Sequence, residues 1–193
     1  MDLNVLLFEN FTALDVFGPV EVLSKVRDYR LRYVSMDGGV VTNEQNIRIE
    51  TEKITPEHRG DIWLLPGGMG TRPLVKDREF LGTLREIAGA SAWFLTVCTG
   101  SAVLAASGAL DGVRATGNKR AFDWTMSCGE KVLWEREPRW VSDGKFYTSA
   151  GVSAGIDMAL AFVADRFGSE KAESIAAMME YFPSENLAPG LRA

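Results

Sequence analysis

Runs of apolar residues alternate along this chain with segments whose apolar positions recur at helical spacing. Residues 61–65 and 92–97 are short apolar runs, which are typical of buried strands. Residues 77–90 instead place Phe80, Leu84 and Ile87 along one face of an amphipathic helix. Strands that alternate with helices in this way predict an α/β sandwich with a mostly parallel central sheet. The predicted strands are 3–8, 32–36, 61–65, 92–97 and part of 140–149, and the predicted helices are 15–26, 77–90, 102–106, 153–167 and 169–181.

The organisation of the chain indicates one folding unit. Its 193 residues contain no internal repeat, low-complexity segment or linker, so we expect a single domain over residues 1–193. Residues 40–50 alternate enough to predict a hairpin or short side strands, and Asp143-Gly144 predicts a second hairpin turn. In a parallel sheet, ligands gather beyond the carboxyl ends of the strands. That rule selects residues 10–15, 66–70 and 98–101 as the candidate site.

Composition and charge exclude several classes of function. The 21 Lys and Arg residues against 26 Asp and Glu residues give a net charge of −5, which argues against binding to nucleic acid. No apolar run approaches the ~20 residues of a membrane span, and the start of the chain lacks the basic region of a secretory signal. Two cysteines do not make a disulfide framework, so we expect a reducing, cytoplasmic location.

Histidine is scarce, which limits the chemistry further. The single histidine of the sequence, His58, lies in a polar connection, and we expect it at the surface rather than in a catalytic site. One histidine and two distant cysteines cannot assemble a zinc site, and we expect neither a metal nor another cofactor. Any enzymatic activity is therefore expected to work without imidazole.

Cys98 is the strongest candidate for chemistry in the chain. It directly follows the predicted strand 92–97 and precedes a helix of small residues, so the turn between them must be tight. Gly100 removes a steric obstacle to that turn, as in the nucleophile elbow of serine hydrolases. A thiol at a helix N-terminus is expected to have a lowered pKa and to ionise near neutral pH. The alternative is a small buried cysteine without a function, which is the interpretation favoured for Cys128.

Two further segments favour a functional role for Cys98. The glycine-rich turn 66–70 would let backbone amides approach a ligand, but it lacks the lysine and the spacing of a nucleotide-binding loop. Asp15 lies among apolar residues just after the first strand, where burial raises the pKa of a carboxyl group towards the range of acid–base catalysis. A simple helix N-cap is the alternative role for Asp15. We predict that its carboxyl lies within hydrogen-bond reach of the Cys98 sulfur or of one bridging water.

Five short motifs occur in order along the chain, and together they resemble a known family. They are Leu14-Asp15-Val16-Phe17-Gly18-Pro19, Leu65-Pro66-Gly67-Gly68, Thr96-Val97-Cys98-Thr99-Gly100-Ser101, Leu110-Asp111-Gly112-Val113-Arg114-Ala115-Thr116 and Gly151-Val152-Ser153-Ala154-Gly155-Ile156-Asp157. The chain resembles the ThiJ/PfpI superfamily, and within it the isocyanide hydratase-like branch, from Val5 to about Tyr181. The resemblance implies a flavodoxin-like three-layer sandwich, usually a homodimer, with a nucleophile-elbow cysteine in a strained backbone conformation.

The resemblance also implies an activity and roles for individual residues. In isocyanide hydratases the elbow cysteine attacks the isocyanide carbon and an aspartate handles protons, which assigns Cys98 as the nucleophile and Asp15 as the acid/base. Thr99 would contribute to catalysis through its backbone, and a threonine in this position disfavours a Cys-His peptidase. The residues implied to bind a small-molecule substrate are Gly67, Gly68, Met69, Asn118 and Gly151.

The chain departs from this branch after its Arg-Ala motif. Isocyanide hydratases have Thr-Thr-His-Trp there, whereas residues 116–120 read Thr-Gly-Asn-Lys-Arg and contain no imidazole. Asn118 would donate a hydrogen bond to a substrate, and Lys119 would lower the pKa of the thiol if it points inward. A solvated basic loop is the alternative for this segment.

Two other hypotheses use the same cysteine. A glyoxalase-type hydratase generally has glutamate in place of Asp15 and a nearby histidine, so the sequence disfavours that activity. A non-enzymatic ligand- or redox-sensing module stays open, because an exposed thiol of low pKa is prone to oxidation. Some transcription regulators carry a domain of this fold before a DNA-binding half. Residues 182–193 are too few for two helix-turn-helix units, so we do not expect a direct regulator, whereas a stand-alone sensor stays open.

Overall fold

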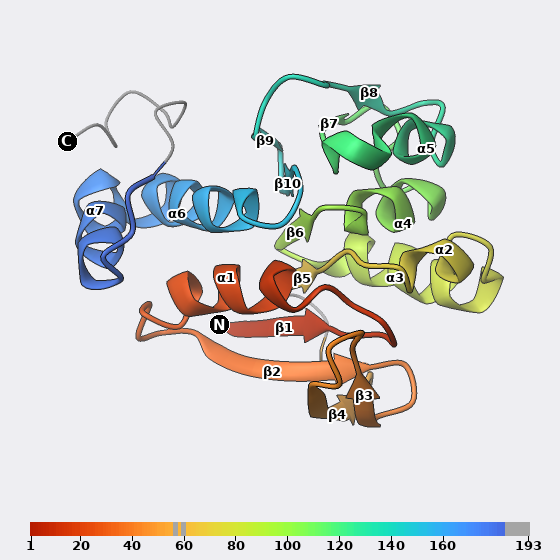
Figure 1. Ribbon diagram of the computed structural model, residues 1–193, viewed down its shortest axis with the longest axis horizontal. Coiled ribbons are helices and arrows are strands. Elements are labelled where there is room, and N and C mark those ends of the chain that lie inside the picture. The colour runs from red at the N-terminus through yellow and green to blue at the C-terminus, as the bar shows by residue number, and fades with distance from the viewer. Residues whose placement is uncertain (56–57, 59–60, 184–193) are drawn as a thin grey trace.

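The computed structural model describes residues 1–55, 58 and 61–183, and in them an eight-stranded sheet forms the centre of the fold (Figure 1). The strand order is β3-β4-β2-β1-β5-β6-β10-β9, and every pair from β4 to β10 is parallel. Antiparallel hairpins complete both edges. The strands are β1 Asp2–Leu6, β2 Arg30–Ser35, β3 Gly39–Thr42, β4 Arg48–Lys53, β5 Ile62–Leu65, β6 Trp93–Val97, β9 Trp140–Asp143 and β10 Phe146–Ser149.

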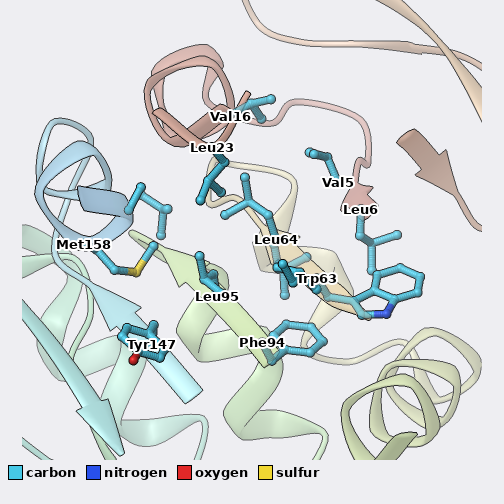
Figure 2. Close-up of a cluster of buried hydrophobic side chains, with 14 of the residues drawn as sticks. Val5, Leu6, Val16, Leu23, Trp63, Leu64, Phe94, Leu95, Tyr147 and Met158 are labelled. Carbon is cyan, nitrogen blue, oxygen red and sulfur yellow. The ribbon is translucent and has the colours of Figure 1, made fainter. Parts of the chain in front are cut away.

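Helices cover both faces of the sheet. On one side α1 packs against α6, which in turn packs against α7, while α3 packs against α4 on the other side. Figure 2 shows the strands between α1, at the top of the view, and the helices of the opposite layer. The helices are α1 Ala13–Leu23, α2 Thr71–Leu74, α3 Arg78–Ala90, α4 Gly100–Ala106, α5 Phe122–Ser127, α6 Ala154–Phe167 and α7 Ser169–Met178. The predicted α/β sandwich with a mostly parallel sheet is confirmed.

The register of the parallel strands builds the core in rows. Leu64 of β5 pairs with Val5 on one side and with Leu95 on the other, and all three side chains are completely buried. Figure 2 shows Leu23 of α1 and Met158 of α6 pointing towards this row. Because side chains alternate along a strand, the neighbouring residues face the opposite helix layer. Burial on both faces explains why these strands read as continuous apolar runs in the sequence.

The elements largely follow the sequence pattern, with shifted ends. The region 40–50 forms the hairpin of β3 and β4, and the second predicted hairpin joins β9 to β10. Asp77 is the N-cap of α3, since its Oδ1 accepts from the backbone N–H groups of Glu79 and Phe80 at 3.1 Å. The pattern missed the single-turn helix α2 and the two-stranded pair of β7, Arg114–Ala115, with β8, Leu133–Trp134.

The expectation that His58 lies at the surface is wrong. The side chain is 4% exposed, and its Nδ1 accepts a hydrogen bond from the Thr55 backbone N–H at 3.1 Å. Its Nε2 lies 3.3 Å from Glu52 Oε2, and its carbonyl oxygen accepts from Asn4 Nδ2 at 3.2 Å. Local polar partners therefore make burial of this histidine possible, which its polar neighbours in the sequence did not indicate.

The helices in the described residues are too short or too polar for any of them to cross a membrane.

Candidate functional site

The three segments selected by the sequence meet at the carboxyl ends of β1, β5 and β6. Phe11, which follows β1, forms an isolated antiparallel bridge with Gly68, which follows β5. The Thr12 N–H donates to the Gly67 carbonyl at 2.8 Å, and the Gly68 N–H donates to Thr99 Oγ1 at 3.1 Å. These contacts join the three loops into one site around the end of β6, as the position of ligands in parallel sheets predicts.

Cys98 occupies the tight turn between β6 and α4. Its φ angle is +61°, a left-handed conformation that is uncommon for a residue with a side chain. The Cys98 N–H donates to the Ser149 carbonyl at 3.1 Å, and the Cys98 carbonyl accepts from Ser101 Oγ at 3.0 Å. A Cβ on Gly100 would lie 2.6 Å from the Leu65 carbonyl oxygen, so the turn requires glycine there. The strained elbow is therefore present at the position that the resemblance implied.

The Cys98 side chain is almost completely buried and lies next to several hydrogen-bond donors. It is 5% exposed, and its Sγ accepts a hydrogen bond from Asn118 Nδ2 at 2.9 Å. The backbone N–H groups of Thr99 and Val152 also interact with the sulfur. The structure thus surrounds the thiol with donors and not with hydrocarbon alone, which separates it from a cysteine that only fills space.

Asp15 belongs to the first turn of α1 and is completely buried. Its Oδ2 accepts from the Gly67 backbone N–H at 2.9 Å. The carboxyl also interacts with the Cys98 thiol and with the Val152 N–H, while Oδ1 is buried without a partner that meets full hydrogen-bond geometry. Burial raises the pKa of Asp15 from 3.8 to about 7, against the lowering effects of Gly67, Cys98 and Val152. The structure brings this carboxyl and the thiol together.

The expected lowering of the Cys98 pKa is wrong in direction. Burial, followed by the negative charge of Asp15, raises the thiol pKa from 9.0 to about 11. Hydrogen bonds from Asn118 Nδ2 and from the backbone of Thr99 and Val152 lower it by less. The start of a short helix does favour an anion, but it does not outweigh desolvation and a carboxylate neighbour. The thiol therefore keeps its proton at neutral pH.

The Thr99 side chain binds the glycine turn that follows β5. Thr99 Oγ1 accepts from the Gly68 N–H and from Thr71 Oγ1, both at 3.1 Å. The Gly67 N–H is taken by Asp15, so both glycine amides have partners within the chain. A Cβ on Gly67 would lie 2.6 Å from the Thr99 nitrogen, which explains the glycine. The Met69 side chain is 59% exposed beside this turn.

Asn118 and Gly151 come from two connections that close over Cys98. The Asn118 Oδ1 accepts from the backbone N–H groups of Arg120 and Ala121 at 3.0 Å and caps the 3-10 helix Lys119–Ala121. A Cβ on Gly151 would lie 2.7 Å from Asn118 Nδ2, so this glycine makes room for the amide. Val152 follows with φ of +50°, which turns its N–H towards Asp15 and Cys98.

The sequence left two roles open for Lys119, and the structure does not support the inward one. Its Nζ donates to Thr116 Oγ1 at 2.7 Å and to the Pro138 carbonyl at 2.6 Å, away from the thiol. Burial lowers the pKa of Lys119. Lys119 is half-buried and the next residue, Arg120, is exposed, so the alternative of a solvated basic loop describes this segment in part. The side chain of this segment that does reach the sulfur is the neutral amide of Asn118.

The chemistry that this arrangement supports is proton transfer next to a sulfur nucleophile. One carboxyl that titrates near neutrality lies beside one protonated thiol, and amide groups face the place where negative charge would form. In the part of the chain that the structure describes, no group of three or more His, Cys, Asp or Glu residues is arranged to hold a metal ion. Val152 lies within the fifth motif but was not among the predicted site residues.

The fold and the site define an α/β sandwich protein with a buried cysteine at a strand-to-helix elbow. The sequence model described as the DJ-1/PfpI family matches residues 1–165, so the chain belongs to that family. The chain is 32% identical over 185 residues to isonitrile hydratase of Pseudomonas putida, a match that covers 95% of this chain and 80% of that protein. Isonitrile is another word for isocyanide.

A transcriptional regulator and a solved structure are also similar to the chain. The regulator CdhR of Pseudomonas aeruginosa is 28% identical over 180 residues, which cover 90% of this chain and 53% of the regulator. The chain therefore spans about half of that relative. A crystal structure of a ThiJ/PfpI family protein from Pseudomonas syringae superposes with a TM-score of 0.85 at 27% identity, covering 98% of this chain and 78% of that one.

Proposed function

We propose that this protein is a cysteine-dependent hydratase that adds water to a small electrophilic carbon, as in the conversion of an isonitrile to an N-substituted formamide. The observation that carries the proposal is the buried pair of Cys98 and Asp15 at the elbow, with the Asn118 amide 2.9 Å from the sulfur. The identity of 32% to isonitrile hydratase over almost the whole chain supports the choice of substrate class.

In the first step the Cys98 sulfur attacks the terminal carbon of the isonitrile, R–NC. The ionised Asp15 carboxylate takes the thiol proton as the carbon–sulfur bond forms, and it then gives that proton to the same carbon. The product is a thioimidate, in which the carbon is bonded to sulfur, to one hydrogen and, doubly, to nitrogen. No proton has left the site at this stage.

In the second step a water molecule attacks the thioimidate carbon. The water loses one proton to Asp15, which passes it to the nitrogen. The hydroxyl on the carbon then loses the second proton of the water to Asp15 as the carbonyl forms and the carbon–sulfur bond breaks, and Asp15 returns this proton to the sulfur. Cys98 leaves as a thiol after proton return, and the released product is the formamide R–NH–CHO. In both steps together, one isonitrile and one water give one formamide. The reaction therefore requires no oxidant, reductant or cofactor.

The ionisation of the pair suits this sequence of steps. With a pKa of about 7, Asp15 is present in both protonation states near neutral pH and can accept and return a proton. The thiol, with a pKa of about 11, does not ionise by itself and depends on Asp15 for activation. We therefore infer that activity rises with pH as Asp15 ionises.

The residues proposed to contact the substrate differ in what they can offer it. The amides of Gly67 and Gly68 are bonded within the chain, so we infer that this turn shapes the site rather than donating to the substrate. The exposed Met69 side chain would supply apolar contact for the organic group of the isonitrile. Gly151 would act through the space that it leaves for Asn118.

The direct test is an assay of formamide formation from one alkyl and one aryl isonitrile. We expect the wild-type protein to form formamide, Cys98→Ala to form none, and Asp15→Ala to be slower by about 100-fold or more. Cys128→Ala is the matched control and should keep full activity, since its Sγ donates to the Trp124 carbonyl at 3.3 Å and lies outside the site. Absence of formamide from the wild-type protein, or activity in Cys98→Ala, would refute the proposal.

A ligand-sensing role is the second candidate, and the similarity to CdhR supports it. The raised pKa and low exposure of Cys98 argue against the redox form of this role, because oxidation begins at an accessible thiolate. Mass spectrometry after mild peroxide treatment tests the redox form. Modification of Cys98 before Cys128 would favour it, and modification of Cys128 alone would exclude it.

A further inference from the structure

Asn118 differs from the other groups around Cys98 because both ends of its side-chain amide are held. Its Oδ1 accepts from the N–H groups of Arg120 and Ala121 at 3.0 Å, and this requires an oxygen at that end. The opposite end must then be the NH2 group, and it lies 2.9 Å from Cys98 Sγ. The hydrogen-bond network thus decides which way the amide points, and it points a donor at the sulfur.

The backbone couples the same two residues a second time. The Asn118 N–H donates to the Cys98 carbonyl at 3.2 Å, so main chain and side chain both join the connection to the elbow. Gly151 completes the arrangement, because a Cβ there would lie 2.7 Å from Asn118 Nδ2 and would displace the amide. Asn118 is therefore fixed by its cap, by its backbone and by the space beside it.

We propose that Asn118 is the positioning residue of Cys98: its fixed amide orients the sulfur towards the substrate and stabilises the negative charge that forms there when Asp15 removes the proton. This inference rests on the proposed nucleophilic role of Cys98. The amide acts through the sulfur and exchanges no proton with the substrate. Because an amide does not titrate in the physiological range, it leaves Asp15 to handle the protons of the site.

The charges around the sulfur explain why a neutral donor matters here. Among the described residues, Asp15 is a charged group that acts on the thiol. Its negative charge raises the pKa of Cys98 and so opposes thiolate formation. Lys119, the cation next to Asn118 in the sequence, donates to Thr116 and Pro138 and not to the sulfur. Hydrogen bonds from Asn118 Nδ2 and two backbone amides are then the groups that favour the anion.

The test measures the reactivity of Cys98 in a Cys128→Ser background, where it is the only thiol of the chain. Two variants separate the roles of Asn118. Asn118→Ser keeps a side-chain oxygen that can cap the 3-10 helix but is too short to reach the sulfur, and Asn118→Leu removes both functions. Asn43→Ser is the matched control, because Asn43 Oδ1 also caps a turn, at 2.9 Å from the Gln45 and Ile47 nitrogens, while its Nδ2 donates to Gln45 and not to sulfur.

We expect iodoacetamide to alkylate Cys98 about tenfold more slowly in both Asn118 variants at mildly alkaline pH, with the midpoint of the pH–rate curve raised by about one unit. Asn43→Ser should react as the parent protein does. Unchanged alkylation in both Asn118 variants would overturn the proposal. A loss in Asn118→Leu alone would also overturn it, because capping and not donation would then explain the effect. The reagent is not an isonitrile, so failure of formamide formation would refute the proposed function and leave this result intact.

Discussion

At the residue scale, Cys98 and Asp15 share an interior that water barely reaches, with side chains 5% and 0% exposed. Burial disfavours the charged form of either acid, so it raises both pKa values. The rise for Asp15 follows from its apolar neighbours and was predictable from the sequence. The rise for Cys98 was not, because the helix-dipole argument considers the elbow alone and leaves out both burial and the carboxylate from α1.

The raised pKa of Asp15 has a consequence for stability. The folded state holds the Asp15 proton more tightly than the unfolded state, so the stabilisation is complete below pH 3.8 and is lost as the pH rises through about 7. Asn in this position can still accept from the Gly67 N–H but cannot ionise. We therefore expect Asp15→Asn to be more stable than the wild type by about 2–4 kcal/mol above pH 7.

Urea unfolding across this pH range measures the effect on the free energy of unfolding. The difference between the two proteins should shrink to nearly zero at acid pH, where wild-type Asp15 is protonated and neutral like asparagine. A difference that is the same at all pH values, or a wild type that is the more stable protein in alkaline solution, would contradict the assignment of a raised pKa.

Asn118 marks the limit of what could be predicted for the site. The sequence showed that an amide replaces the imidazole of the resembled branch, but not that its donor faces Cys98 Sγ rather than a substrate. That contact spans 20 residues of chain and depends on how the connection before α5 closes over the elbow. The position of Lys119 depends on the same closure, which is why the sequence left its role open.

At the element scale, the sequence predicted the long elements well because their apolar patterns are strong. The buried strands β5 and β6 and the amphipathic helix α3 need no tertiary information, since apolar runs and helical periodicity specify them. The helix α2 has four residues and β8 has two, which is too short for any periodicity to register. Their formation depends on contacts with the rest of the fold.

The elbow between β6 and α4 leads to a prediction about two helical glycines. A Cβ on Gly100, the first residue of α4, would lie 2.6 Å from the Leu65 carbonyl and 2.7 Å from the Pro66 carbonyl. We expect Gly100→Ala to lower the free energy of unfolding by about 2–4 kcal/mol, because backbone atoms of β5 and of the glycine turn would have to shift.

Gly82 in the interior of α3 is the matched comparison. A Cβ there meets no atom within 4 Å, so Gly82→Ala should raise the free energy of unfolding by about 0.5–1 kcal/mol through helix propensity alone. Denaturant unfolding of both variants gives the signs directly. Effects of the same sign would show that close packing at the elbow does not explain the glycine at position 100.

At the scale of the whole molecule, the candidate site is assembled from segments spread over most of the chain. Asp15 follows β1, Cys98 follows β6 and Val152 follows β10, and each is brought to the same edge by the parallel order of the strands. A fold of this kind supports several functions, and the chain is similar in sequence both to an isonitrile hydratase and to a transcriptional regulator. The activity must therefore be argued from the site. The homodimer and the single domain that we expect from the sequence stay predictions.

The C-terminal helices are joined to the site by a chain of polar contacts. The Tyr181 hydroxyl donates to Asp157 Oδ1 at 2.8 Å, and the Arg139 guanidinium donates to Oδ2 of the same carboxylate at 2.6 and 2.9 Å. The Arg139 carbonyl in turn accepts from the Ala150 N–H at 2.7 Å, next to the connection that carries Val152. Burial raises the pKa of Tyr181 to about 12, so its hydroxyl keeps its proton across the working range.

Tyr181→Phe removes the first contact of this chain without changing the shape of the ring. We expect it to lower the free energy of unfolding by about 1–2 kcal/mol, since a hydrogen bond to a buried carboxylate is lost. Tyr33→Phe is the control and should change stability by less than about 0.5 kcal/mol, because the Tyr33 hydroxyl has no hydrogen-bond partner among the residues that the structure describes. Urea unfolding at neutral pH compares the two variants. Equal losses would show that the hydrogen bond to Asp157 adds no stability of its own. The coupling between the C-terminal helices and the site would then have to be abandoned.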